Sequence, residues 1–163
     1  MTGDFLAEKS GAKINRIKYN ALTASATVGG NRVFLLKPQT FMNLSGNPTR
    51  QAMNYLRLPI ENVVVVSDDV SLPMGKLRIR RSGSSGGHNG LKDIIAKCGG
   101  EGFPRIKIGV GAPPHKDYEM MDWVLAKLSS DDEKLLKSAA QRAAEALVLL
   151  ITDGVDRAML EYN

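Results

Sequence analysis

The sequence predicts an α/β fold, a three-layer α/β/α sandwich with a mixed, mostly parallel sheet. Stretches with strand-like patterns are interleaved with stretches of helical apolar periodicity along the chain. One predicted strand, Asn62–Ser67, is a continuous β-branched run, which is typical of a central strand covered on both faces. The link that follows it, Asp68–Gly75, is shorter than a parallel crossover requires, so we expect the next strand to run antiparallel.

The predicted elements alternate along the chain. We expect helices at Asp4–Lys9, Pro48–Arg57, Leu91–Lys97 and Asp131–Asp153, and strands at Thr23–Val28, Val33–Lys37, Asn62–Ser67, Lys76–Arg81 and Arg105–Val110.

The last helix has the clearest sequence signals. Ser130 and Glu133 have the spacing of a capping box, and Gly154 can close the far end. Its apolar stripe, which favours a structural role, consists of Leu135, Leu136, Ala139, Ala140, Ala143, Ala144, Leu147, Leu150 and Ile151.

Length and composition indicate one globular domain over residues 1–163. The chain has an apolar fraction of 43%, and its apolar runs are too short to span a bilayer, so no membrane role is expected. Its one cysteine, Cys98, excludes an intrachain disulfide and fits a reducing compartment. Because no secretory leader is evident, we expect a cytoplasmic protein.

The basic residues favour a polyanionic partner. The formal net charge is +5, and strand alternation places Lys76, Arg78 and Arg80 on one face with Leu77 and Ile79 on the other. This pattern predicts a basic stripe backed by core. The alternative is an ordinary solvated face of an edge strand.

Two polar clusters follow predicted strands, where sites form in α/β sheets. Asn43 lies in "QTFMNLSG" after one strand, and Asp68 lies in "SDDVSLPMG" after the valine run. These residues are candidates to face one cleft. The alternative is that each caps a turn or loop.

The stretch "RSGSSGGHNGLKD", Arg81–Asp93, is a glycine-rich loop ahead of a predicted helix. Its backbone N–H groups and the helix N-terminus suit a phosphate or a developing oxyanion. The glycine spacing matches neither a Walker loop nor a dinucleotide fingerprint. A flexible connector is the alternative, but a connector requires neither His88 nor Asn89.

Metal and thiol chemistry are not favoured. Asp68 and Asp69 are adjacent on a strand and so point to opposite faces, which makes a shared magnesium ion unfavourable. Cys98 is expected to be a buried core residue. Two histidines without cysteine partners do not indicate a zinc site. His115 lies in a proline-set loop and is expected to be exposed.

Four ordered motifs carry a family resemblance. In order, "LLKPQTFMNLSG", "VVVVSDDVSLPMGKLRIR", "GSSGGHNGLKDII" and "FPRIKIGVGAPP" closely resemble bacterial peptidyl-tRNA hydrolase, as does "DWVLAKLSSDDEK". The resemblance runs over nearly the whole chain. It implies hydrolysis of the ester between a peptide and the 3′ ribose of tRNA, without a metal or organic cofactor.

The resemblance also implies roles for individual residues. Asn43 would place the ester and the attacking water, Asp68 would orient a catalytic histidine, and Asn89 would contact the tRNA end. The remaining tRNA-binding positions are Phe41 and Met42 as walls of the site, and Arg78, Arg80 and Lys107 as phosphate contacts.

One departure from the family pattern is expected to matter. The family begins with a strand, a Gly-Asn-Pro-Gly loop and a segment with the histidine general base, and this sequence shows none of these. We therefore expect an N-terminally incomplete domain with little or no hydrolysis. The alternatives are a non-catalytic tRNA- or RNA-binding homologue and a rebuilt site in which His88 is the base.

The same departure affects the expected assembly. The intact family is expected to be monomeric. A missing first strand would leave a neighbouring strand unpaired, and such an edge favours self-association.

Overall fold

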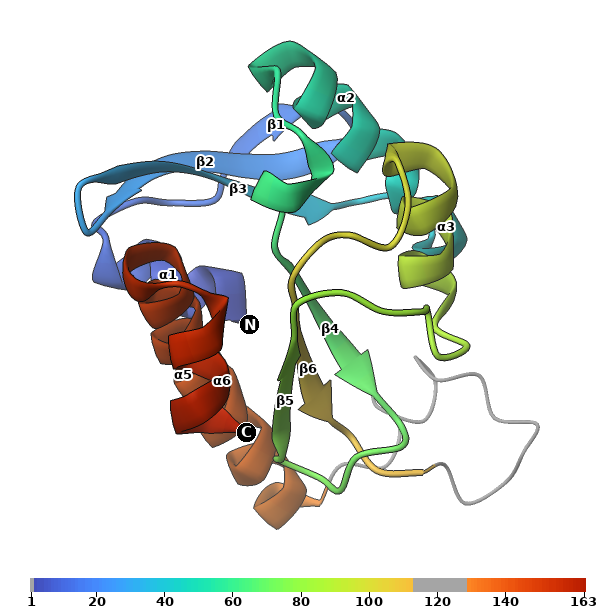
Figure 1. The fold of residues 1–163 in the computed structure, drawn as a ribbon. Helices are drawn as coiled ribbons and strands as arrows, with labels where there is room; N and C mark the ends of the chain where they lie inside the picture. Colours follow the sequence, from blue (N-terminus) through green and yellow to red (C-terminus); the bar gives the residue numbers. More distant parts are fainter. Residues whose placement is uncertain (1, 113–128) are drawn as a thin grey trace.

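The computed structural model describes residues 2–112 and 129–163, and its helices lie on both sides of the strands (Figure 1). The elements, in chain order, are α1 (Thr2–Lys9), β1 (Arg16–Lys18), β2 (Ala21–Val28), β3 (Asn31–Pro38), the 3₁₀ helix η1 (Met42–Leu44), α2 (Gly46–Leu56), the 3₁₀ helix η2 (Ile60–Asn62), β4 (Val65–Asp69), β5 (Leu77–Arg80), α3 (Asn89–Cys98), β6 (Arg105–Gly109), α5 (Ser130–Asp153) and α6 (Val155–Tyr162).

The first sheet has the strand order β1-β2-β3 and is antiparallel throughout. Gly29 and Gly30 join β2 to β3 with φ angles of 55° and 81°. Positive φ at both central positions is the requirement of a type I′ hairpin turn. The tight turn fixes a register of eight residue pairs, from Val28 opposite Asn31 to Ala21 opposite Pro38.

The second sheet has the strand order β4-β6-β5. β6 pairs in parallel with β4 and antiparallel with β5. β5 therefore runs opposite to β4, as the short link between them predicts, although β6 lies between the two. The α/β class with a mixed sheet is confirmed.

Two details of the predicted sheet are wrong for the described residues. Three of the four strand pairs are antiparallel, because a two-residue turn joins β2 to β3 and cannot serve a parallel pair. The valine run is not central among the described strands: β4 pairs with β6 alone, and β6 is the central strand.

Two apolar clusters cover the second sheet on its opposite faces. The larger packs against α1, α5 and α6, and it includes Leu6, Leu77, Ile79, Ile106, Ala143 and Leu147. The smaller packs between the sheet and α2 and α3, and it includes Met53, Ile60, Leu91, Ile94, Cys98 and Phe103. Val66 packs against the first cluster and Val65 against the second, so β4 is covered on both faces, as predicted.

Several element ends differ from the predictions. The N-cap of α5 is Ser129, whose Oγ accepts from the Asp132 N–H, one residue before the predicted capping box. Leu135 is 48% exposed and does not belong to the buried stripe. Gly154 ends α5 as expected, but α6, like β1, was not predicted.

Two further expectations concern individual residues and membrane association. Cys98 is buried, as expected. His115 lies outside the described residues. Within the described ranges, no helix combines the length and apolar character that crossing a bilayer requires.

Candidate active site

An aspartate and a histidine meet near the carboxyl end of β4. The Asp68 Oδ1 atom lies 2.9 Å from His88 Nε2, and the two side chains are 30% and 15% exposed. Asp68 comes from the polar cluster after the valine run and His88 from the glycine-rich loop. The fold therefore brings together two stretches that the sequence singles out separately.

The second ring nitrogen of His88 caps a helix. His88 is the N-cap of α3, and its Nδ1 atom accepts a hydrogen bond from the Leu91 N–H at 3.2 Å. A nitrogen that accepts carries no proton, so the proton of the neutral ring lies on Nε2 and is donated to Asp68. Both ring nitrogens of His88 are thus engaged.

The Asp68 carboxylate is held in its ionised form. Burial disfavours the charge, but the hydrogen bond and the electrostatic interaction with His88 outweigh burial, so the pKa of Asp68 lies below its usual value. At neutral pH Asp68 is therefore an anion that can orient a second donor or stabilise a nearby positive charge.

Phe41, Met42 and Asn43 lie together at the start of η1. Phe41 and Met42 are 82% and 43% exposed, which is unusual for large apolar side chains and leaves them accessible to a ligand. Met42 packs closely on α3: a Cβ atom added at Gly90 would lie 2.7 Å from Met42 Sδ. The small residue at position 90 therefore permits this contact beside the Asp68–His88 pair.

A carboxylate that was not predicted anchors this segment. Asp93 Oδ2 accepts from the Gly46 N–H at 2.7 Å, and Asp93 Oδ1 pairs with Lys97 Nζ at 2.9 Å. Asp93 lies in α3 and Gly46 begins α2, so the contact fixes the residues after Asn43 against the helix that carries Asn89.

Asn43 and Asn89 are both exposed, and neither lines the cavity that Asp68 and His88 line. Asn43 lies in η1 and Asn89 is the first residue of α3. Their sequence neighbours Met42 and His88, together with Asp68, line one cavity. The fold thus places residues from all three predicted polar stretches around one opening.

The basic stripe lies on the adjacent strands. Leu77 and Ile79 are buried while Arg78 is exposed and Arg80 half-buried, which confirms the predicted alternation. In the register of β5 and β6, Arg78 lies opposite Lys107. The basic face defined here consists of Arg78, Arg80 and Lys107.

Asp69 is a structural partner of this basic face. Its Oδ1 accepts from the Ser71 N–H at 2.8 Å, and its Oδ2 lies 3.7 Å from Lys107 Nζ. Burial raises the pKa of Asp69, but the Ser71 hydrogen bonds and the nearby cations Lys107 and Arg78 outweigh it and lower the pKa overall. Asp68 and Asp69 thus have separate partners, and no cluster of metal-ligating side chains occurs within the described residues.

A buried arginine secures the glycine-rich loop. Arg105 is 1% exposed, and its guanidinium donates to the carbonyls of Ser84, Glu101 and Phe103. It also lies over the Phe103 ring at 4.1 Å from the centroid. Sequence patterning gave no indication of this role, because the alternation of a strand does not distinguish a buried arginine from an exposed one.

Fold and site together define an α/β protein with an acid–imidazole pair near the carboxyl end of a strand and a basic face beside it. The sequence model of the family described as "Peptidyl-tRNA hydrolase" matches residues 1–163. The chain therefore belongs to the peptidyl-tRNA hydrolase family.

Individual relatives agree with the family match. The chain is 44% identical to the peptidyl-tRNA hydrolase of Caldanaerobacter subterraneus subsp. tengcongensis, over 100% of this chain and 87% of the relative. It is 42% identical to that of Alkaliphilus metalliredigens, over 98% of this chain and 85% of the relative. The crystal structure of the peptidyl-tRNA hydrolase from Acinetobacter baumannii superposes with a TM-score of 0.91 at 30% identity, covering 99% of this chain and 82% of that one.

These matches bear on the expected absence of an N-terminal segment. The family model spans the chain from its first residue to its last, so the match gives no support to a truncated domain. The described residues contain a single histidine, His88, and it is committed to Asp68 and to the cap of α3.

Proposed function

We propose that this protein binds peptidyl-tRNA in the cytoplasm and that its site is built to cleave the ester between the peptide and the 3′ ribose. The observation that supports the proposal is the ionised Asp68, oriented by His88 at an opening flanked by exposed apolar side chains and a basic face. A half-buried, oriented carboxylate of this kind can position a proton carrier in acid–base hydrolysis.

The surrounding residues bind the substrate and the attacking water. The carboxamides of Asn43 and Asn89 hydrogen-bond the ester and the attacking water, because an amide offers both a donor and an acceptor. Phe41 and Met42 provide exposed apolar surface for the terminal base or the first peptide side chain. Arg78, Arg80 and Lys107 bind acceptor-stem phosphates.

The hydrogen bonds of His88 limit its use as a general base. Its acceptor nitrogen already accepts from the Leu91 N–H, so proton abstraction requires loss of the helix cap. General-base assistance contributes about 10²- to 10⁴-fold to such reactions. We therefore propose that the 163-residue chain hydrolyses the ester slowly. The same observation favours, as a second candidate, a non-catalytic tRNA-binding protein.

A hydrolysis assay with added imidazole separates these two functions. Purified protein is incubated with N-blocked aminoacyl-tRNA, and release of the acyl group is followed with and without imidazole. We expect slow cleavage that free imidazole accelerates, because imidazole can act as the base while His88 stays bound to Asp68 and to the cap of α3. Binding without cleavage, with or without imidazole, would establish the non-catalytic function instead.

Substitutions test the roles of the residues in the same assay. Asp68→Ala should remove the imidazole-dependent rate, whereas Asp156→Ala, an exposed aspartate in α6, should leave it unchanged. His88→Ala and His115→Ala identify the source of any basal rate. Rapid cleavage without imidazole that is abolished by His88→Ala would overturn the proposed limitation and assign the base to His88.

A further inference from the structure

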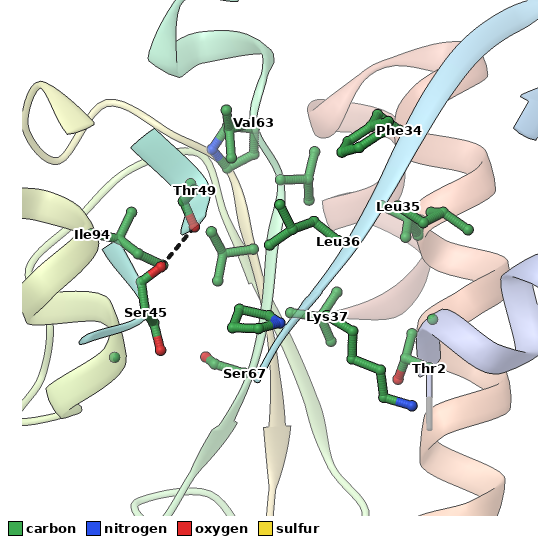
Figure 2. Close-up of a pocket in the computed structure, with 18 of the residues that line it drawn as sticks. Thr2, Phe34, Leu35, Leu36, Lys37, Ser45, Thr49, Val63, Ser67 and Ile94 are labelled. Carbon is green, nitrogen blue, oxygen red and sulfur yellow. Dashed lines mark hydrogen bonds between the residues drawn. The ribbon is translucent and has the colours of Figure 1, made fainter. Parts of the chain in front are cut away.

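A large cavity separates the two sheets. It has a volume of about 1000 Å³ and lies between β3 and the segment that contains β4. Figure 2 shows Leu36 and Lys37 of β3 on one side, with Val63 and Ser67 of the β4 segment on the other. This volume is at the upper end of the range of small-molecule sites. We call this cavity the inter-sheet slot.

Each side of the inter-sheet slot is a strand edge without a partner strand in the described part of the chain. β3 pairs with β2 alone, and β4 pairs with β6 alone. A free strand edge presents a row of unpaired N–H and C=O groups, which is a template for another strand. Here two such edges line the same cavity.

Apolar side chains cover the slot from both faces. Helices α2 and α3 contribute Met53, Leu91 and Ile94 on one face, and α5 contributes Leu136, Ala140 and Leu147 on the other. An occupant therefore meets apolar groups above and below. Strands buried on both faces are continuous Val, Ile and Leu runs rather than alternating ones.

Two buried hydroxyls lack partners at the slot. Thr40 Oγ1 and Ser67 Oγ are inaccessible to solvent and make no hydrogen bond within the described residues, and both residues line the cavity. Buried polar groups without partners are rare, because each one destabilises the protein by about 1–3 kcal/mol. An occupant with its own backbone donors and acceptors would satisfy them.

We propose that the inter-sheet slot binds an extended apolar peptide strand, which pairs with β3 and β4 at once and joins the two three-stranded sheets. A compact apolar ligand could fill the volume but could not satisfy two rows of backbone groups. β4 has five residues and β3 has eight, so we expect the paired part of the peptide to be between these two lengths. The slot is the same cavity that Met42, Asp68 and His88 line, but its test contains no tRNA, so its failure is distinguishable from failure of the proposed function.

The test uses the 163-residue protein and a synthetic peptide with a Val-Ile-Val-Leu-Val-Ile core and flanking lysines. Binding is followed by calorimetry, and amide hydrogen exchange is followed by NMR. We expect exchange at the slot-facing amides of β3 and β4 to slow at least about tenfold when the peptide binds. The control peptide has the same side chains with alternate backbone nitrogens methylated, so it cannot pair and should give no protection.

A protein variant provides the matched control. Leu36→Lys places a charge in the slot and should abolish peptide binding, while Ile17→Lys, on β1 at a position 78% exposed, should not change it. Equal protection by the methylated peptide, or binding without protection of β3 and β4, would overturn the proposal. A third outcome would also overturn the proposal. If protection of the β3 and β4 amides rises with protein concentration in the absence of peptide, and sedimentation detects dimers, the occupant is a second copy of the chain.

Discussion

His88 links the local fold to the chemistry of the site through its two ring nitrogens. One nitrogen caps α3 and the other holds Asp68. Because the helix begins at Asn89, the same side chain positions a residue proposed to contact the ester. A change at position 88 therefore acts on the helix, on the carboxylate and on Asn89 together.

The cap makes a prediction about stability. His88→Ala should lower the free energy of unfolding by about 1–2 kcal/mol, because the Leu91 N–H and Asp68 both lose a partner. His88→Asn should lower it less, because an asparagine side chain can still accept from that N–H. Urea denaturation at neutral pH measures both variants, and equal losses would show that the cap contributes nothing.

Asp68 makes a prediction about pH. Its pKa is lowered in the folded protein, so the ionised group adds stability above the unfolded pKa of about 3.9, and this stability is lost as the pH falls through the folded pKa. The difference in unfolding free energy between wild type and Asp68→Asn should therefore shrink as the pH is lowered below about 4. A difference that stays constant in acid would contradict the assignment.

At the scale of elements, the glycine-rich loop depends on β6 for its position. Arg105 lies in the central strand and donates to the Ser84 carbonyl at 3.1 Å, near the start of the loop that ends at His88. Burial is the main reason that the pKa of Arg105 is lowered, and the Glu101 carboxylate partly offsets this effect. Hydrogen bonds to three carbonyl groups hold the guanidinium in place.

Replacing this arginine should loosen the loop and destabilise the protein. Arg105→Leu removes the donor from one buried and two partly buried carbonyls and should lower the unfolding free energy by about 2–3 kcal/mol. The matched control is Arg81→Leu: the Arg81 side chain is 60% exposed and pairs with exposed Asp156, so the effect should stay within about 0.5 kcal/mol. Chemical denaturation compares the two, and equal effects would show that burial of Arg105 is unimportant.

Elements with strong local patterns were predictable, and the others were not. The alternation of Leu77 and Ile79 with arginines identified β5, and Gly154 identified the end of α5. β1 was missed because its three residues are too few for an alternating pattern to indicate a strand. α6 was missed because it has only eight residues and begins directly after Gly154, the glycine that ends α5.

The site was predictable residue by residue but not as pairs. Strand-end position and family resemblance singled out Asp68, and the loop composition singled out His88, yet their contact joins residues 20 positions apart. The contacts of Arg105 and Asp93 are likewise tertiary. No local pattern encodes which buried polar group meets which, because that depends on the packing of α3 against the sheet.

At the scale of the whole molecule, the formal net charge is +5, and three of the basic residues form the basic face on β5 and β6. The basic face approaches β4 through Lys107, whose Nζ lies 3.7 Å from Oδ2 of Asp69, the residue next to Asp68. A polyanion bound there would place its end near the carboxylate. This arrangement predicts which cations contribute to tRNA binding.

Salt dependence tests this arrangement. Arg78→Ala and Arg80→Ala should each weaken tRNA binding and reduce the slope of log affinity against log salt by about 0.7–0.9 per lost phosphate contact. Lys13→Ala removes an exposed cation from the loop after α1 and should leave the slope unchanged. Filter binding over a salt series measures all three, and unchanged slopes for the arginine variants would make the basic face a solvated surface only.

The rate at which the Cys98 thiol is chemically labelled can report motion near the site. Its Sγ lies 3.7 Å from the Gly46 carbonyl and the side chain is 1% exposed, while burial raises the pKa of the thiol. An alkylating reagent can reach it only when α2 and α3 separate. The rate of chemical labelling at this position therefore reports how often α3, the helix that carries Asn89, separates from α2. No probe has to be added to the chain.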